Sequence, residues 1–195
     1  MTGEFVTAGH LGGYVAGGDP DTTYPQMWNV ITRAMRHART SMTMLDIGCG
    51  DGATMRAFRY LGWDVVHGVD GVPQSDGDIV CHDYSAGPVP EPLLLREYDL
   101  VWSCEFVEHV PHEHRDAYMA DMTRGRLVMM THALPGQPGH HHVNCQPADY
   151  WIELFAEYGY RLDVEVTRLY RAVAELNGRP AESNYFARTG MVFAR

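Results

Sequence analysis

The sequence predicts an α/β protein with a single doubly wound sheet, mostly parallel and with helices on both faces. Three observations lead to this fold class. Apolar, strand-like segments alternate with helical ones along the chain, as in βαβ units. Several of these strands are apolar throughout, which is typical of strands buried on both faces. The chain has 195 residues, 45% of them hydrophobic, so it can bury one core but hardly two.

The helices and strands follow from local patterns. An amphipathic helix is predicted at 23–39, where Met27, Ile31 and Met35 recur at intervals of four. The apolar strand 42–48 runs into glycines, and the helix at 51–62 ends at Gly62. The later predicted elements are strands at 63–71, 78–85 and 98–104, a helix at 112–122, a strand at 125–133 and a helix at 147–160. A terminal strand pair, 160–166 and 190–195, supplies the antiparallel C-terminal strand.

Composition excludes several classes of function. The chain has 25 acidic residues against 15 basic ones, a formal net charge of −10, and every basic residue is an arginine. Without lysine there is no P-loop and no lysine Schiff base, so pyridoxal phosphate chemistry is excluded. The acidic balance and the lack of a long basic run argue against a nucleic-acid partner.

The sequence also predicts where the protein is located and the state of its cysteines. No apolar run approaches the roughly eighteen residues of a membrane span, and the first residues lack the pattern of a signal peptide. We therefore expect a cytoplasmic protein with no membrane partner. Its four cysteines, Cys49, Cys81, Cys104 and Cys145, are widely spaced, which predicts neither a disulfide framework nor a cysteine zinc site.

A glycine-rich turn follows the first predicted strand, in the stretch LDIGCGDG at 45–52. Gly48, Gly50 and Gly52 have no Cβ atoms, so the backbone there can approach a ligand closely. Asp46 precedes the turn and could hold a cationic group. Asp70, at the end of the second strand, lies near the roughly 20-residue offset at which an acid meets ribose hydroxyls in dinucleotide-binding folds.

This stretch, together with GVDG at 68–71, resembles the class I S-adenosylmethionine-dependent methyltransferases, which have a Rossmann-like sheet. The resemblance covers roughly residues 42–166. It implies that Asp46 places the methionine part of the cofactor, that Asp70 holds the ribose, and that Asp83 and Tyr84 flank the adenine. The expected cofactor-binding residues are Asp46, Gly48, Cys49, Gly50, Gly52, Asp70, Gly71, Asp83, Tyr84 and Ser103.

Two other interpretations of the glycine turn remain open. Gly48, Gly50 and Ala53 also satisfy the G-x-G-x-x-A pattern of nicotinamide dehydrogenases. Against this, the third glycine falls at 52, and an anionic Asp46 would repel a pyrophosphate while suiting a sulfonium ligand with an ammonium group. The second interpretation is a tight turn that binds no ligand.

The resemblance also divides the chain into two parts. Residues 41–195 form the methyltransferase domain, and residues 1–40 form an N-terminal lid segment and helix. Within the latter, residues 9–28 combine five glycines with Tyr14, Tyr24 and Trp28. Glycines provide hinges and aromatic rings cover apolar or sugar faces, so we expect a lid over cofactor and acceptor. The alternative is a flexible tail followed by a packing helix.

A group of acids and histidines follows the fourth predicted strand. Glu105, Glu108 and His109 have the spacing E-x-x-E-H, which places them on one face of a helical turn. The motif resembles that of small-RNA 2′-O-methyltransferases of plants and bacteria and of ubiquinone-pathway O-methyltransferases. In the former, this motif and a downstream histidine hold a divalent metal. Here His140, His141 and His142 follow the fifth strand.

The implied metal ligands are Glu105, Glu108, His109, His141 and His142. Carboxylates and imidazoles favour Mg²⁺ or Mn²⁺, with Zn²⁺ less favoured. Two alternatives stay open: a metal-free site, in which the motif caps a helix and touches the cofactor, and a solvated charge run.

Taken together, these motifs predict O-methylation of a small hydroxylated acceptor such as a sugar, a glycan terminus or a phenolic metabolite. Glu105, Glu108 and His109 are the predicted catalytic residues, assisted by a divalent metal. Without a metal, His109 would act as the general base. A non-catalytic subunit that only binds S-adenosylmethionine is the remaining alternative.

Overall fold

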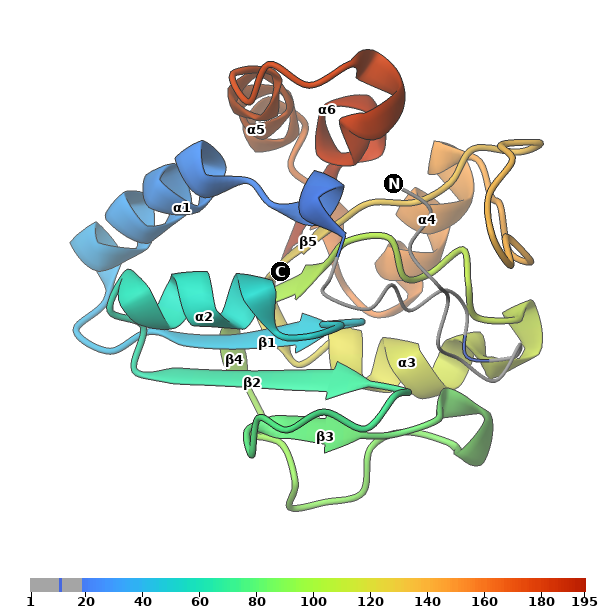
Figure 1. The fold of residues 1–195 in the computed structure, drawn as a ribbon, viewed down its shortest axis with the longest axis horizontal. Coiled ribbons are helices and arrows are strands. Elements are labelled where there is room, and N and C mark those ends of the chain that lie inside the picture. The colour runs from blue at the N-terminus through green and yellow to red at the C-terminus, as the bar shows by residue number, and fades with distance from the viewer. Residues whose placement is uncertain (1–10, 12–18) are drawn as a thin grey trace.

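Seven strands form one twisted sheet in the computed structural model, which describes Leu11 and residues 19–195 (Figure 1). The strand order is β3-β2-β1-β4-β5-β7-β6. The strands are β1 (Thr43–Ile47), β2 (Val65–Asp70), β3 (Ile79–Cys81), β4 (Tyr98–Ser103), β5 (Gly125–Met130), β6 (Arg161–Leu162) and β7 (Met191–Ala194). Strands β1 to β5 pair in parallel, while β7 runs antiparallel to β5 and β6. The predicted fold class is confirmed.

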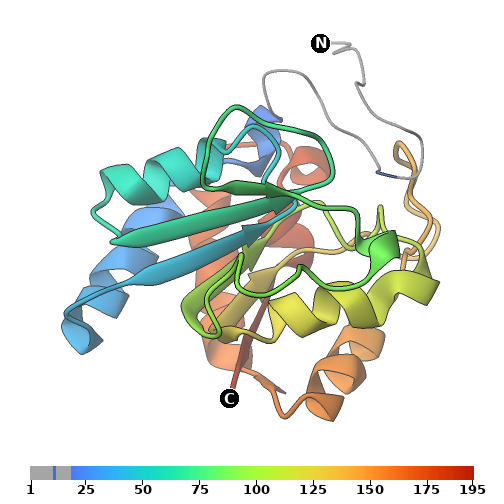
Figure 2. The same cartoon turned by 90° about the horizontal axis from the view of Figure 1, so that it is seen from below.

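In the described part of the chain, six α-helices cover the two faces of this sheet (Figure 2). They are α1 (Pro25–Ala38), α2 (Ala53–Tyr60), α3 (Arg115–Met122), α4 (Ala148–Glu157), α5 (Val164–Glu175) and α6 (Tyr185–Thr189). Successive strand residues alternate between the faces. In β1, Met44 packs in a core with α1, α2, α5 and α6, while Leu45 packs in a second core with α3 and α4. Two buried layers therefore hold the sheet rigid between them.

The sheet has its switch point between β1 and β4, because the chain winds outward from β1 toward β3 in one direction and from β4 toward β5 in the other. In parallel α/β sheets the crevice at this point, beyond the carboxyl ends of the strands, is where ligands bind. The loops after β1, β2, β4 and β5 all leave from this edge.

One predicted element is wrong. The segment 160–166 was expected to be a strand, but only Arg161 and Leu162 pair with β7, and α5 begins at Val164. Asp163 caps this helix, since its carboxylate accepts a hydrogen bond from the Val166 N–H at 3.0 Å. The predicted strand 78–85 is likewise shortened to β3, and Asp83 caps the 3₁₀ turn Tyr84–Ala86 that follows.

The predicted N-terminal lid lies largely outside the described residues, which omit 1–10 and 12–18. The described part of this segment contains the short 3₁₀ turn Pro20–Thr22 and helix α1. Within the part of the chain that the structure describes, no helix is both long and apolar enough to cross a membrane.

Candidate active site

The glycine turn after β1 is shaped by backbone angles that favour glycine. Gly48 has a φ of 75°, and a Cβ built there would lie 2.7 Å from the ring of Phe106. The N–H groups of Gly48 and Cys49 both donate to the Val69 carbonyl, at 2.9 and 3.1 Å. These contacts fasten the turn to β2 and leave its outer edge facing the cavity at the switch point.

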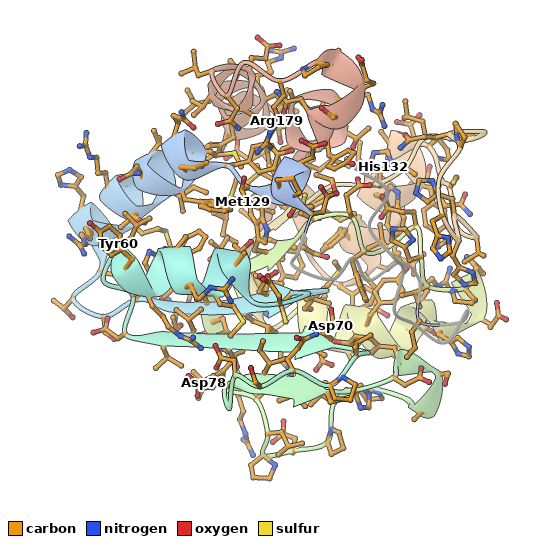
Figure 3. All side chains as sticks on the ribbon, viewed as in Figure 1. Tyr60, Asp70, Asp78, Met129, His132 and Arg179 are labelled. Atoms are coloured by element: carbon orange, nitrogen blue, oxygen red, sulfur yellow. The ribbon has the colours of Figure 1, made fainter. Side chains whose placement is uncertain are left out.

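Asp70, labelled in Figure 3, is the last residue of β2. Two backbone amides fix its side chain. Its two carboxylate oxygens accept hydrogen bonds from the Gly50 N–H at 2.8 Å and the Val72 N–H at 2.9 Å. Burial raises the pKa of Asp70, and these two hydrogen bonds lower it again. Each oxygen keeps a free lone pair. Asp70 can therefore still accept from the hydroxyls of a ribose.

Asp46 is a buried acid whose hydrogen bonding is incomplete among the described residues. It lies in β1, is 2% exposed, and its Oδ2 atom has no hydrogen-bond partner among the described residues. Burial raises the pKa of Asp46 well above its usual value, and the nearby Asp70 raises it further. A buried carboxylate without a donor is costly unless a ligand supplies one. A cation or ammonium group in the cavity would meet that need.

Two adjoining cavities occupy this edge of the sheet. The larger, of about 500 Å³, is lined by five of the predicted cofactor residues: Asp46, Gly48, Cys49, Gly50 and Asp70. The smaller, of about 100 Å³, is lined by Asp70, Gly71, Asp83 and Tyr84 among others. Asp70 and Phe106 border both cavities. An elongated ligand could thus bind with one part in each.

Two predicted cofactor residues line neither of these cavities. Ser103 is 1% exposed, and its hydroxyl donates to the Ile47 carbonyl at 3.0 Å, which links β4 to β1. Gly52, with a φ of 77°, is the N-cap of α2. Both shape the backbone that carries the cavity walls.

The E-x-x-E-H motif forms a tight turn after β4. Glu105 has a φ of 54°, an angle at which a residue other than glycine is strained. The His109 N–H donates to the Phe106 carbonyl at 2.9 Å and closes the turn. The Glu108 carbonyl accepts from the N–H groups of Val143 and Asn144, at 2.9 and 3.1 Å. This last contact attaches the histidine-rich loop after β5 to the motif.

Four side chains meet where the turn and the loop touch. Glu105, Glu108, His109 and His142 each offer one ligand atom, and these atoms all lie within 4.8 Å of one another. The His109 and His142 rings have centroids 5.0 Å apart. His141, which has a φ of 51°, does not belong to this group. Glu105, His109, His140 and His142 also line the larger cavity.

The acids of this group are held in an unfavourable environment. Burial raises the pKa of Glu105 well above 4.5, and the charge of Glu108 raises it further. Burial likewise raises the pKa of Glu108, which is fully buried, and neither of its carboxylate oxygens has a hydrogen-bond partner in the described chain. Burial, followed by the neighbouring His142, lowers the pKa of His109 to about 4. The histidine is therefore neutral at physiological pH.

A family model described as a methyltransferase domain matches residues 24–165. The chain belongs to this methyltransferase family. The matched residues include the glycine turn, Asp70 and the E-x-x-E-H motif, and the protein is an S-adenosylmethionine-dependent methyltransferase. No curated protein is similar enough in sequence to be identified as a relative.

Solved methyltransferase structures share the fold. The plantazolicin methyltransferase in complex with SAH has a TM-score of 0.56 at 10% identity, covering 90% of this chain and 85% of that one. The methyltransferase domain of a bacterial Hen1 protein has a TM-score of 0.51 at 13% identity, covering 87% of this chain and 97% of that one. The Burkholderia thailandensis 1,6-didemethyltoxoflavin-N1-methyltransferase has a TM-score of 0.50 at 18% identity, with coverages of 75% and 72%. At these identities the likeness concerns the fold alone.

The methyltransferase structure adds site residues that sequence reasoning missed. Gln137 orients His142, because its carbonyl lies 3.2 Å from Nδ1 of the ring. Gly139 leaves room for the same ring, since a Cβ there would lie 2.2 Å from it. The far wall of the larger cavity includes Asp19, Thr22, Glu182, Tyr185 and Arg188. No motif marks these residues, and only the folded chain brings them to the cavity.

Proposed function

We propose that this methyltransferase methylates a hydroxyl group of a small acceptor with the help of a divalent cation. The single observation that carries the proposal is the convergence of Glu105, Glu108, His109 and His142. All of them except the fully buried Glu108 line the cavity that also contains the glycine turn and Asp46. The acceptor hydroxyl and the methyl donor would then meet in one enclosure.

The four side chains fit a divalent cation. A half-buried carboxylate, Glu105, and a fully buried one, Glu108, lie close together and both have raised pKa values, and Glu108 has two oxygens without partners in the described chain. A cation would satisfy those oxygens and remove the repulsion between the two acids. Oxygen ligands with one or two imidazoles suit Mg²⁺ or Mn²⁺, and Zn²⁺ less well.

Asp46 and the glycine turn fit S-adenosylmethionine. The ammonium and sulfonium groups of this cofactor are cationic, and Asp46, whose Oδ2 has no partner among the described residues, lines the cavity. Asp70 would bind the ribose, and the smaller cavity beside Tyr84 would receive the adenine. Gly48 keeps the backbone close to the ligand.

Methyl transfer is an in-line displacement. The acceptor oxygen attacks the methyl carbon, the carbon–sulfur bond breaks with its electron pair going to sulfur, and the acceptor proton leaves. The chain aligns the two partners and excludes water. When bound, a divalent cation lowers the pKa of an oxygen that it coordinates. With the pKa of the acceptor hydroxyl lowered in this way, its proton would pass to solvent, while His109, neutral because of its lowered pKa, would serve as a ligand.

The size and charge of the site favour a small acceptor. A cavity of about 500 Å³ is in the range of small-molecule pockets. The formal net charge of −10 disfavours a nucleic-acid backbone as the acceptor. Sugars, glycan termini and phenolic metabolites carry the required hydroxyl groups, and their faces can pack against Tyr185 in the cavity wall.

A metal-free reaction is the second candidate, and the neutral His109 favours it. In that case the imidazole alone would take the acceptor proton, and Glu105 and Glu108 would only orient the acceptor. Both candidates predict turnover of S-adenosylmethionine and differ in their dependence on a cation.

The test is calorimetric titration of metal-stripped protein with Mn²⁺, followed by turnover assays on diols and phenols with and without a chelator. Saturable Mn²⁺ binding that is lost in Glu108→Gln, together with loss of turnover on chelation, would support the proposal. Glu113→Gln is the matched control, because Glu113 is an exposed acid nearby. Turnover that does not change when a chelator is added would support the metal-free reaction, with His109 as the general base.

A further inference from the structure

Arg188 brings a positive charge to a cavity that is otherwise rich in acids. It lies in α6, near the C-terminus, and lines the same cavity as Glu105 and His109. Among the described residues lining this cavity it is the only arginine. The other walls carry the carboxylates of Asp19, Asp46, Asp51, Asp70, Glu105 and Glu182.

The guanidinium of Arg188 has no counter-ion among the residues that the structure describes. Its Nε atom is buried and has no hydrogen-bond partner among the described residues. The hydrogen bond recorded for it is a long one, from Nη1 to the Glu182 carbonyl at 3.4 Å. By contrast, Arg59 pairs with Asp76 at 2.6 Å and Arg124 pairs with Asp121 at 2.8 Å. A guanidinium left unpaired beside a cavity has donors available for a ligand.

The nearby acids are otherwise engaged. Asp19 accepts hydrogen bonds from the Asp21 N–H at 2.8 Å and from the Tyr185 hydroxyl at 3.4 Å. Glu182 is exposed, and its contact with Arg188 is through the main chain. The charge of Arg188 lowers the pKa of Glu105 and of Glu108, so it lies within electrostatic reach of both. No nitrogen of Arg188 comes within 4 Å of a carboxylate in the described chain.

We propose that Arg188 binds an anionic group of the acceptor, a carboxylate or a phosphate, and thereby turns the acceptor hydroxyl toward Glu105 and His109. This inference rests on the proposed function and narrows its substrate class to hydroxylated acids. The planar guanidinium suits both anions, since it offers paired N–H donors to two oxygens at once.

Electrostatics explains why such an acceptor would need this residue. A chain with a formal net charge of −10 repels anions in general, and the cavity adds further acids. A half-buried guanidinium with no ion-pair partner among the described residues is the feature that could reverse this repulsion locally. The acceptor would then be held at two points, with its anion at Arg188 and its hydroxyl at the four-residue cluster. Two-point binding reduces the number of wrong orientations that the acceptor can adopt.

The experiment titrates the protein loaded with S-adenosylhomocysteine and Mn²⁺ with matched pairs of probes. Dihydroxybenzoate is compared with catechol, glucuronate with glucose, and glycerol phosphate with glycerol. The first two pairs test a carboxylate and the third a phosphate. The variants are Arg188→Gln, Arg188→Lys and the control Arg33→Gln, which removes the same charge from the exposed face of α1.

We expect at least one charged probe to bind wild-type protein roughly 10- to 100-fold more tightly than its neutral partner. Arg188→Gln should abolish this preference, Arg188→Lys should keep part of it, and Arg33→Gln should leave it unchanged. If no charged probe is preferred, or if Arg188→Gln keeps the preference, the inference is overturned. Binding of S-adenosylhomocysteine is measured first in every variant, so a failure of the proposed function or of folding is recognised separately.

Discussion

The hydroxyl of Thr131 accepts a hydrogen bond from the backbone N–H of Glu105 at 2.9 Å. Thr131 follows β5 directly, and Glu105 comes two residues after β4, so the contact spans the carboxyl ends of two neighbouring strands. Glu105 has a φ of 54°, and holding such an angle costs roughly 1–3 kcal/mol. The threonine therefore helps to hold in place the residue whose carboxylate enters the candidate metal site.

Thr131→Val tests this support. Valine has the same shape but no hydroxyl, so the N–H of Glu105 would lose its partner at a cost of about 1–3 kcal/mol. We expect Mn²⁺ affinity to fall roughly tenfold or more, because groups behind the ligands usually matter by such factors. Thr131→Ser keeps the hydroxyl and should bind Mn²⁺ like the wild type. Equal Mn²⁺ affinity in calorimetric titrations of the valine and serine variants would contradict this role.

Gly139→Ala tests the position of His142. A Cβ at residue 139 would lie 2.2 Å from the His142 ring, so the imidazole must move away from the two glutamates. We expect Mn²⁺ affinity to fall roughly 10- to 100-fold while the melting temperature changes little. Gly77→Ala is the control, since a Cβ there meets nothing within 4 Å. An alanine variant that binds Mn²⁺ as tightly as the control would show that His142 is not a ligand.

Asp46→Asn tests the recognition of the methionine part of the cofactor. The substitution removes a buried carboxylate whose pKa is raised by burial and by Asp70, so the ligand-free protein should be as stable as the wild type or more so. Affinity for S-adenosylmethionine should fall about tenfold or more, because a charge-assisted hydrogen bond is lost. Thermal unfolding and calorimetry together separate the two effects. Unchanged affinity would remove Asp46 from the cofactor site.

The two glutamates make cation binding depend on pH. Their pKa values are raised in the folded protein above the usual 4.5, so the stability that they contribute without a metal is present below about pH 4.5 and is lost as the pH rises. Cation binding requires both acids to be ionised and therefore releases protons. We expect Mn²⁺ affinity, and the Mn²⁺-induced rise in melting temperature, to increase between pH 5.5 and 8.

Proton release can be measured directly by calorimetry in buffers of different ionisation enthalpy. The measured heat of Mn²⁺ binding should depend on the buffer in the wild type, because the released protons are taken up by the buffer. A smaller buffer dependence in Glu108→Gln fits the raised pKa of Glu108. An apparent heat of binding that is the same in all buffers would mean that both carboxylates are already ionised.

The sequence points to site residues that lie at or just after the end of a strand, because that position alone brings them to the edge of the sheet. Asp46 and Asp70 lie at the ends of adjacent parallel strands, and such strand ends must meet at one edge of the sheet. Glu105, Glu108 and His109 follow a third strand of the same sheet and share its edge. Strand pattern and glycine spacing suffice to place them.

The details that the sequence left open or missed depend on contacts that no local pattern encodes. His141 and His142 are adjacent and chemically identical, and the left-handed backbone of His141 decides which imidazole joins the cluster. Arg188 reaches the cavity only because α5 and α6 pack against the sheet, and α5 begins in a segment expected to be a strand. The valine-rich stretch after Asp163 favours a strand locally, but the capping aspartate and packing against α1 make it a helix.

The Glu108 carbonyl accepts hydrogen bonds from the N–H groups of both Val143 and Asn144, so backbone contacts attach the histidine loop to the E-x-x-E-H turn. Because this link uses no side-chain atom, replacing the carboxylate leaves the histidine loop attached. The candidate ligands are therefore already organised without an ion, and a divalent ion would not have to organise the loop as it binds. Binding of such an ion should accordingly be fast, with little change in the loop, and the enzyme should accept whichever suitable divalent ion its surroundings supply.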